Sequence, residues 1–254
     1  MGKLAIIENQ PSQYNYNQPG LFAEQYYLLR KKENRIYTDE ELLLLPQVKP
    51  SHQYFREWAI RKNSCNRLIK WLEQKDTPLK ILEVGCGNGW LSAQLGLIEN
   101  ASVTGIDINT IELEQAQRVF AKKENLDFIL GDLRECIPED KIFDVIVFAA
   151  SLQYFNSLKE IITVALQHLS LQGEIHITDT CFYTQDKIDA ARQRTEQYFN
   201  TMGFEAMAQF YFHHCVDDLN KFNYSVLYDP NALLNRFSKN KNPFYHVVIK
   251  NRYQ

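Results

Sequence analysis

The sequence predicts an α/β fold with a doubly wound, mostly parallel sheet that helices cover on both faces. The first observation is that, from residue 79 onward, short apolar runs alternate with longer segments of helical periodicity. The second is that the apolar runs are nearly continuous, as expected for strands that are buried on both faces. The third is length, because 254 residues with 45% hydrophobic content suffice for one such domain with an added lobe.

Five apolar runs in the middle of the chain predict the buried strands. In chain order they are LKILEV (79–84), SVTGID (102–107), LDFIL (126–130), FDVIVFA (143–149) and GEIHIT (173–178). Segments with helical periodicity lie between them, at WLSAQLGL (90–97), TIELEQAQRVFAKKE (110–124) and LKEIITVALQHL (158–169). Because parallel neighbours need long crossover connections, strands that alternate with helices indicate a parallel sheet.

The tail from Asp186 predicts a helix, a strand, a second helix and a last strand. The segments are DKIDAARQRTEQYFNTM (186–202), FEAMAQFYFHH (204–214), a helix that opens at Asp229-Pro230, and PFYHVVIK (243–250). The last strand starts with a proline, which is tolerated at that position. The two tail strands raise the predicted number of strands to seven.

Residues 11–60 are rich in Gln, Asn and Tyr, unlike the rest of the chain, and we predict a helical, tyrosine-rich cap over residues 1–75 ahead of a domain over 76–254. Thr38 with Glu41 forms a capping-box pattern before a short helix that Pro46 ends, and apolar residues at helical spacing predict a long helix over 53–75. We expect residues 11–60 to form a lid over the open edge of the sheet. Its tyrosines would contact the substrate: Tyr14, Tyr16, Tyr26, Tyr27 and Tyr37.

Charge and cysteine content narrow the class of protein. The net charge of −3 and the lack of an uninterrupted basic run argue against a nucleic-acid partner. Five cysteines without metal-ligand or redox spacing predict a reduced, cytoplasmic chain with no metal site. The apolar runs are far shorter than a membrane span, so we expect no membrane partner. The sequence does not decide between a monomer and a homodimer.

The stretch ILEVGCGNGW at 81–90 gives the strongest indication of a ligand. Three glycines at alternate positions follow a predicted strand, and in an open parallel sheet ligands bind beyond the carboxyl ends of the strands. Trp90 occupies the third glycine position of the nicotinamide-binding fingerprint G-x-G-x-x-G. Glu83 would repel a pyrophosphate and attract an amine, so the pattern favours a different cofactor.

Two further acids stand at the ends of the next two strands. Asp107 ends VTGID, where a carboxylate can accept hydrogen bonds from both hydroxyls of a ribose. Asp132 follows the next strand, in ILGDL, and can accept from an adenine amine. An amine site, a ribose site and an adenine site without a phosphate site fit S-adenosylmethionine.

The ordered series EVGCGNG, GID, GDL, FDVIVFAASLQYF and LQGEIHI resembles class I S-adenosylmethionine-dependent methyltransferases, of the small-molecule type 11 or type 12 domain. The resemblance implies a Rossmann-like, seven-stranded, mostly parallel sheet with an antiparallel terminal strand. It implies that ten residues form the cofactor site: Glu83, Gly85, Cys86, Gly87, Asn88, Asp107, Ile108, Asp132, Leu133 and Ala149. Among them, Glu83 would orient either the glycine turn or the amino-acid end of the cofactor. It places residues 151–154 near the transferred methyl group, so Gln153 and Tyr154 are candidates for catalysis. His213, on a predicted tail strand, is a third candidate.

Methyl transfer depends mainly on positioning, so the sequence does not disclose the acceptor. The leading hypothesis is an S-adenosylmethionine-dependent enzyme that methylates a small molecule. The alternatives are a non-catalytic S-adenosylmethionine-binding domain that serves a partner protein, a protein methyltransferase, and a nicotinamide oxidoreductase. An RNA substrate is disfavoured because the chain lacks a basic surface.

Overall fold

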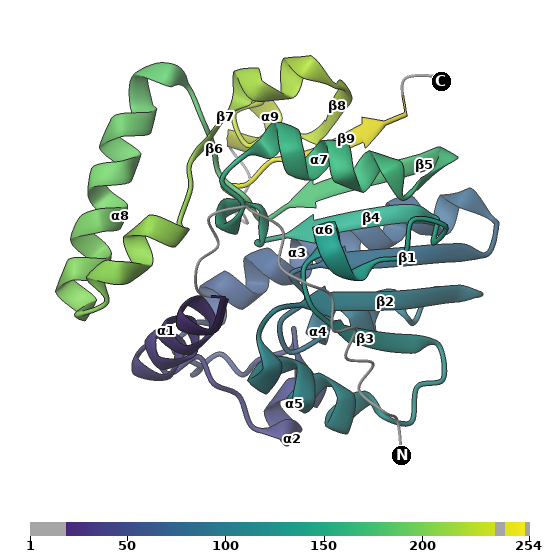
Figure 1. Cartoon of the computed structure of the whole chain (residues 1–254), viewed down its shortest axis with the longest axis horizontal. Helices are drawn as coiled ribbons and strands as arrows, with labels where there is room; N and C mark the ends of the chain where they lie inside the picture. Colours follow the sequence, from purple (N-terminus) through teal and green to yellow (C-terminus); the bar gives the residue numbers. More distant parts are fainter. Residues whose placement is uncertain (1–18, 237–241, 252–254) are drawn as a thin grey trace.

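A computed structural model describes residues 19–236 and 242–251, which are built around one seven-stranded sheet (Figure 1). The strand order is β3-β2-β1-β4-β5-β9-β8; β1 to β5 run parallel, and β9 is antiparallel to both of its neighbours. The strands are β1 (Leu79–Val84), β2 (Ala101–Asp107), β3 (Leu126–Leu130), β4 (Phe143–Ala149), β5 (Leu169–Thr178), β8 (Asn223–Tyr228) and β9 (His246–Lys250). The predicted fold class and the antiparallel terminal strand are confirmed.

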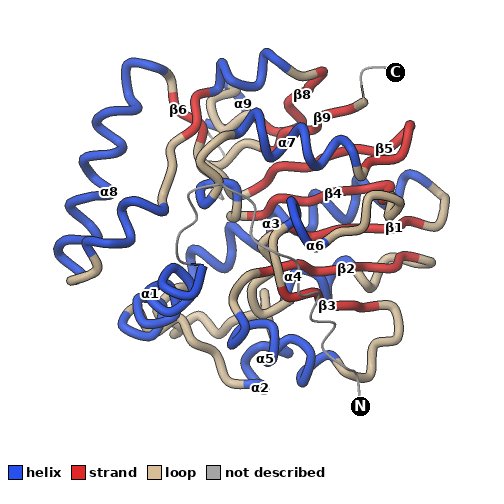
Figure 2. The backbone as a smooth tube through the Cα atoms, viewed as in Figure 1, coloured by secondary structure: helices blue, strands red, loops and turns tan. Residues whose placement is uncertain are grey.

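Helices cover both faces of the sheet, as the predicted alternation requires (Figure 2). One face packs against α2 (Asp39–Leu44), α3 (Phe55–Leu72), α4 (Trp90–Leu95) and α5 (Thr110–Phe120). The other face packs against α6 (Leu133–Cys136), α7 (Leu158–Gln167) and the 3₁₀ segment η5 (Val216–Lys221). The short helix α9 (Leu233–Arg236) follows β8, three residues after the predicted opening at Pro230.

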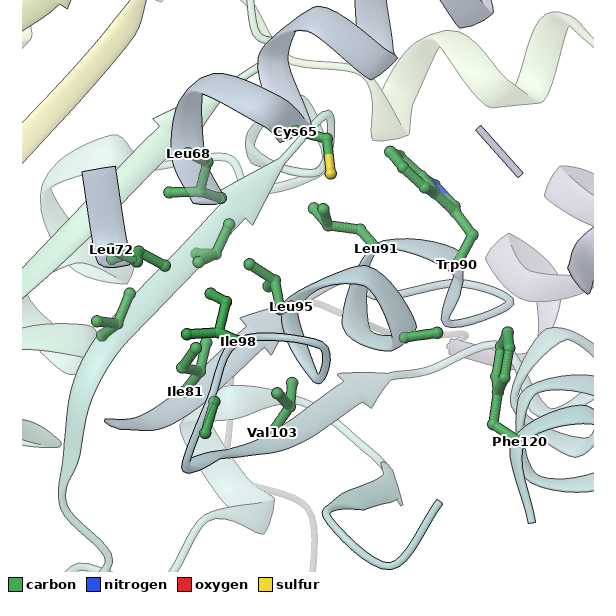
Figure 3. Close-up of a cluster of buried hydrophobic side chains, with 14 of the residues drawn as sticks. Cys65, Leu68, Leu72, Ile81, Trp90, Leu91, Leu95, Ile98, Val103 and Phe120 are labelled. Atoms are coloured by element: carbon green, nitrogen blue, oxygen red, sulfur yellow. The ribbon is translucent and has the colours of Figure 1, made fainter. Parts of the chain in front are cut away.

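Successive residues of the central strands enter opposite cores, because side chains alternate across a strand. Ile81 of β1 belongs to the core beneath α3 and α4, whereas its neighbour Leu82 belongs to the core beneath α7. Figure 3 shows the first of these cores, in which Leu68 of α3 and Leu95 of α4 lie around Ile81. Trp90 packs edge-on against Trp58, with ring centroids 5.2 Å apart, so it is a core residue of this layer.

The N-terminal segment has two structurally different parts. The predicted long helix is α3, which continues as the 3₁₀ turn η1 (Glu73–Lys75) and packs on the sheet rather than over its edge. The predicted capping box at Thr38 is present at the start of α2. Among the described helices of this segment, only α1 (Pro19–Lys32) is separate from the two sheet cores. Helix α3 thus belongs to the helical layer of the sheet, although it precedes residue 75. The domain boundary at residue 75 stays a prediction.

A third, smaller hydrophobic cluster joins α1 to the tail of the chain. Leu29 of α1 is buried against Phe199 of α8 (Ile188–Met202) and Met207 of the 3₁₀ segment η4 (Glu205–Phe210). Figure 1 shows α1 and α8 at the left, away from the helices that cover the faces of the sheet. We call these three elements, α1, α8 and η4, the cap.

The strand predicted at 204–214 is wrong, because most of that segment forms η4. Phe204, Met207 and Phe210 recur every third residue, which matches the three-residue turn of a 3₁₀ helix, and they pack into the cap. At its end, His214 and Cys215 form the short strand β7, which pairs with β6 (Phe182–Tyr183). The 3₁₀ turn η3 (Gln185–Lys187), α8 and η4 lie between these two strands in the chain. The seventh strand of the main sheet is β8. Among the described helices, none combines the length and apolarity that a bilayer crossing requires.

Candidate functional site

A cavity of about 760 Å³ lies where the carboxyl ends of β1, β2 and β4 meet the loop after β3. Its lining includes Val84 and Gly85, Ile106 to Asn109, Gly131 to Glu135, and Ala150 and Ser151. Residues of α1, α5, η2 (Leu152–Tyr154), α7 and η4 also line the cavity. Its volume is in the range typical of small-molecule and cofactor sites, which occur at this edge of parallel sheets.

The three glycines after β1 serve different purposes, although all have positive φ angles. A Cβ on Gly85 would lie 2.5 Å from Cβ of Ser151, so this glycine lets the loop after β4 approach the turn. A Cβ on Gly89 would lie 2.7 Å from the Phe128 ring, which is a packing requirement. A Cβ on Gly87 would meet only the carboxylate of Glu112, at 3.4 Å. Gly85 and Gly87 line the cavity, and the absence of a side chain at Gly87 leaves the backbone accessible from the cavity.

Asp107 ends β2 inside the cavity, as the sequence predicts. One carboxylate oxygen accepts from the backbone N–H of Gly87 at 2.7 Å, and the other accepts from the N–H of Asn109 at 2.8 Å. Burial raises the pKa of Asp107, and the backbone donors of Asn109 and Gly87 oppose that shift. Each oxygen retains acceptor capacity, so the carboxylate can receive hydroxyl donors from a ligand.

Glu83 does not line the cavity, so of its two predicted roles the structure matches the positioning of the glycine turn and not the contact with an amino-acid end. It is 2% exposed beneath the glycine turn, where it accepts from the hydroxyl of Ser92 on α4. Burial raises the pKa of Glu83 to about 8, so the carboxyl is mostly neutral at pH 7. Glu83 therefore fixes the turn to α4 and supplies no charge to a ligand.

Six of the ten predicted cofactor residues line the cavity, and four do not. Those that do are Gly85, Gly87, Asp107, Ile108, Asp132 and Leu133. The exceptions are Glu83, Cys86, Asn88 and Ala149. Cys86 is buried against Gly105, and the Asn88 side chain accepts from the backbone N–H of Trp90. Ala149 ends β4 one residue before the cavity. Ala150, at φ +54°, takes the place expected for Ala149.

Asp132 has a structural as well as a cavity-lining role. Its carboxylate caps α6 by accepting from the backbone N–H of Arg134 at 2.9 Å, and it forms an ion pair with the guanidinium of the same residue. The carboxylate remains at the cavity wall beside Leu133. Its charge is thus already balanced, so we expect a hydrogen-bonding role toward a neutral group such as an amine of adenine.

Four aromatic rings from three distant segments form a wall of the cavity: Phe22, Tyr26, Tyr154 and Phe210. Phe22 contacts each of the other three, with ring centroids 5.3 to 5.7 Å apart. Behind them, Nη2 of Arg30 donates to the hydroxyl of Tyr154 at 3.1 Å, and the guanidinium lies 4.7 Å from the centre of the Tyr26 ring. The cap is therefore joined to η2 by stacking and by a hydrogen bond.

Tyr154 is the only one of the three predicted catalytic residues that lines the described cavity. The Gln153 side chain donates to the carbonyl of Ala150 at 2.6 Å, which keeps it within its own loop. His213 pairs with Thr195 of α8 at 2.9 Å and does not line the cavity. We no longer expect Gln153 or His213 to contact a reacting group.

The predicted tyrosine lid is only partly matched by the structure. Tyr26 lines the cavity, whereas Tyr37 accepts from the indole N–H of Trp58 and packs on the sheet core. Tyr27 is not part of the lining, and Tyr14 and Tyr16 lie outside the described residues.

Sequence reasoning missed several cavity residues, among them Phe22, Asn109, Glu112 and Phe210. Glu112 carried a usable signal, because it lies in the first turn of the helix that follows Asp107. Phe210 carried none, since only the packing of η4 against α1 brings it to the cavity.

Comparisons with known proteins agree with this geometry. A family model described as a methyltransferase domain matches residues 75–226. A malonyl-[acyl-carrier protein] O-methyltransferase of Halalkalibacterium halodurans is 26% identical over 172 residues, which are 63% of this chain and 64% of the relative. A ubiquinone biosynthesis O-methyltransferase of Rickettsia prowazekii is 30% identical over 99 residues, 38% of each chain. The chain thus spans less than two thirds of the length of these relatives.

Solved structures share the fold. The plantazolicin methyltransferase BpumL in complex with S-adenosylhomocysteine (SAH) superimposes with a TM-score of 0.55 at 17% identity, over 93% of this chain and 98% of that one. The CurJ carbon methyltransferase gives a TM-score of 0.59 at 15% identity, over 92% of this chain and 68% of that one. Since the family model also covers more than half of the sequence, the chain belongs to the methyltransferase domain family.

Proposed function

We propose that the protein is an S-adenosylmethionine-dependent methyltransferase that methylates a small molecule. The observation that carries the proposal is Asp107, held by two backbone N–H groups at the end of β2 and open to a cavity of about 760 Å³ beside a bare glycine turn. The relatives named O-methyltransferases, and the neighbours solved with SAH, support the same activity.

The residues around the cavity fit the proposed cofactor. Asp107 would accept from the ribose hydroxyls, and Ile108 would pack on the adenine ring. Asp132 and the backbone of Leu133 would receive the adenine amine. The bare backbone at Gly85 and Gly87 would lie along the rest of the cofactor, because a Cβ at Gly87 would project toward Glu112.

On the acceptor side, the aromatic wall would exclude water and orient the substrate. S-adenosylmethionine, when bound, supplies an electrophilic methyl group on a sulfonium. The Tyr154 oxygen accepts from Arg30, so the Tyr154 proton is free to be donated into the cavity. We assign Tyr154 the role of hydrogen-bonding to the acceptor molecule, while Phe22 and Phe210 hold its apolar part.

The cap would close this cavity during the reaction. Phe22 and Tyr26 reach it from α1 and Phe210 reaches it from η4, so a movement of the cap as a unit would displace three of the four rings of the aromatic wall together. We therefore extend the proposed lid from the N-terminal segment to α8 and η4. A cytoplasmic location and a monomeric or homodimeric state stay predictions.

Incubation with labelled S-adenosylmethionine and an extract of the source cells tests the proposal. We expect the label to appear in a small molecule that mass spectrometry can identify, and an Asp107→Ala variant, assayed in parallel, to give little of it. Label found only in protein would instead indicate a protein methyltransferase. Binding of SAH without any transfer of label would indicate a non-catalytic domain.

A further inference from the structure

Glu112 is a carboxylate in the cavity without a donor of its own. It lies in the first turn of α5 and lines the cavity beside Asp107. Both of its oxygens face the glycine turn, 3.4 and 3.5 Å from where a Cβ of Gly87 would lie. In the part of the chain that the structure describes, neither a side chain nor a backbone N–H donates to it. A carboxylate in this position needs hydrogen-bond donors from a ligand.

Asn109 adds an independent observation in the same cavity. The residue lines the cavity, is 2% exposed, and its amide Nδ2 has no hydrogen-bond partner among the described residues. Its Oδ1 accepts from the N–H groups of Ile111 and Glu112 at 3.1 and 3.2 Å, which caps α5. Because these two hydrogen bonds to Oδ1 fix the plane of the amide group, Nδ2 cannot turn toward another acceptor. The site therefore offers a donor as well as acceptors.

The charges around Glu112 also favour a ligand that donates hydrogen bonds. Two charged groups act on it, Asp107 from β2 and Arg30 from α1, and Glu112 in turn raises the pKa values of Tyr26 on α1 and Cys86 in the glycine turn. Burial raises the pKa of Glu112 to about 8, the Asp107 charge acts in the same direction, and Arg30 opposes both. The carboxyl is therefore mostly neutral at pH 7 without a ligand, and hydroxyl donors from a ligand would stabilise its ionised form.

The donors and acceptors distinguish two parts of the proposed cofactor. An ammonium group only donates, so it would leave Nδ2 of Asn109 unpaired, and the α-carboxylate beside it, which could accept from Nδ2, would be repelled by Asp107. A hydroxyl both donates and accepts, so a vicinal diol can donate to the two carboxylates and accept from Asn109. We propose, building on the function proposed above, that Glu112 and Asn109 bind the ribose diol together with Asp107. Glu112 then acts as a specificity residue for the ribose beside Asp107.

Titration calorimetry with two ligands tests this assignment. Both SAH and 5′-methylthioadenosine carry adenine and the ribose diol, but only SAH carries the amino-acid end. We expect Glu112→Ala and Asn109→Ser to weaken the binding of both ligands by the same factor, about tenfold or more for the carboxylate. Ser at position 109 retains an oxygen that can cap α5. The exposed Glu114, on the same helix, provides the matched control Glu114→Ala, which should change neither affinity.

A pH series adds a readout that a merely structural role would not change. Since bound hydroxyls lower the pKa of Glu112, the affinity of the wild-type protein should rise between pH 6.5 and 8, by at most about tenfold per unit for one proton. Glu112→Gln retains an acceptor oxygen but no titration, so it should bind better than Glu112→Ala and lose this part of the pH dependence.

Each other outcome has a distinct meaning. Weakened binding of SAH alone would assign Glu112 to the ammonium group and overturn the proposal. Unchanged binding of both ligands by the folded Glu112→Ala variant would overturn it too. A wild-type protein that binds neither ligand would refute the proposed function itself.

Discussion

Replacing Gly85 and Gly87 separately by alanine should produce two different defects. Both glycines have φ angles in the left-handed region, at +74° and +52°, where an L-residue costs about 1–2 kcal/mol. At Gly85 the new Cβ would lie 2.5 Å from Cβ of Ser151, so overpacking adds roughly 1–3 kcal/mol. At Gly87 the nearest atom is a Glu112 oxygen at 3.4 Å, an ordinary contact that adds little.

We therefore expect Gly85→Ala to lower the free energy of unfolding by roughly 2–5 kcal/mol, and Gly87→Ala by about 1–2 kcal/mol. The methyl group of Gly87→Ala projects into the cavity, where the backbone must be approached closely, so SAH affinity should fall by about tenfold or more. Urea denaturation without ligand measures the first quantity, and calorimetry with SAH measures the second. A Gly87→Ala protein that binds SAH as tightly as the wild type would refute the assignment of this turn to the cofactor.

Three further substitutions test other parts of the account. Asp107→Ala should weaken SAH binding at least about tenfold in calorimetry, because a hydrogen bond to a charged group contributes about 1.5–3 kcal/mol; an unchanged affinity would mean that the ribose lies elsewhere. Tyr154→Phe, which removes the hydroxyl held by Arg30, should lower kcat about tenfold at unchanged SAH affinity, and an unaltered kcat would exclude Tyr154 from acceptor contact. Burial raises the pKa of Glu83 to about 8, whereas its pKa in the unfolded chain is near 4.3. The free energy of unfolding should therefore fall as the pH rises between these two values, by at most about 1.4 kcal/mol per pH unit. Glu83→Gln should flatten this slope in urea titrations from pH 5 to 8, and an identical slope would contradict the burial argument.

The sheet and one side of the cavity were predictable because their signals are local. Buried parallel strands are continuous apolar runs, and Asp107 and Asp132 stand directly after such runs, so the sequence places them at one edge. Glu83 satisfies the same pattern, yet its side chain turns into the space beneath the glycine turn and bonds to Ser92. A strand-end position predicts where a residue lies and leaves open which way its side chain points.

The aromatic side of the cavity was less predictable because it depends on contacts between distant segments. Phe210 reaches the cavity only because η4 packs with α1 around Leu29 and Met207. The run that contains it has enough aromatic residues to suggest a strand, but tertiary packing decides in favour of a 3₁₀ helix. The edge strand β8 was not predicted, because several of its side chains are exposed and its sequence contains no apolar run.

Calorimetric titration of the folded protein with SAH and, in parallel, with NAD tests the central claim most directly. The claim is that the cavity at the ends of β1, β2 and β4 binds the adenosine and amino-acid parts of S-adenosylmethionine. We expect saturable binding of SAH at one site per chain and no measurable binding of NAD, because the core residue Trp90 stands at the third glycine position of the nicotinamide-binding fingerprint. Binding of NAD with comparable affinity, or no binding of SAH, would contradict the account.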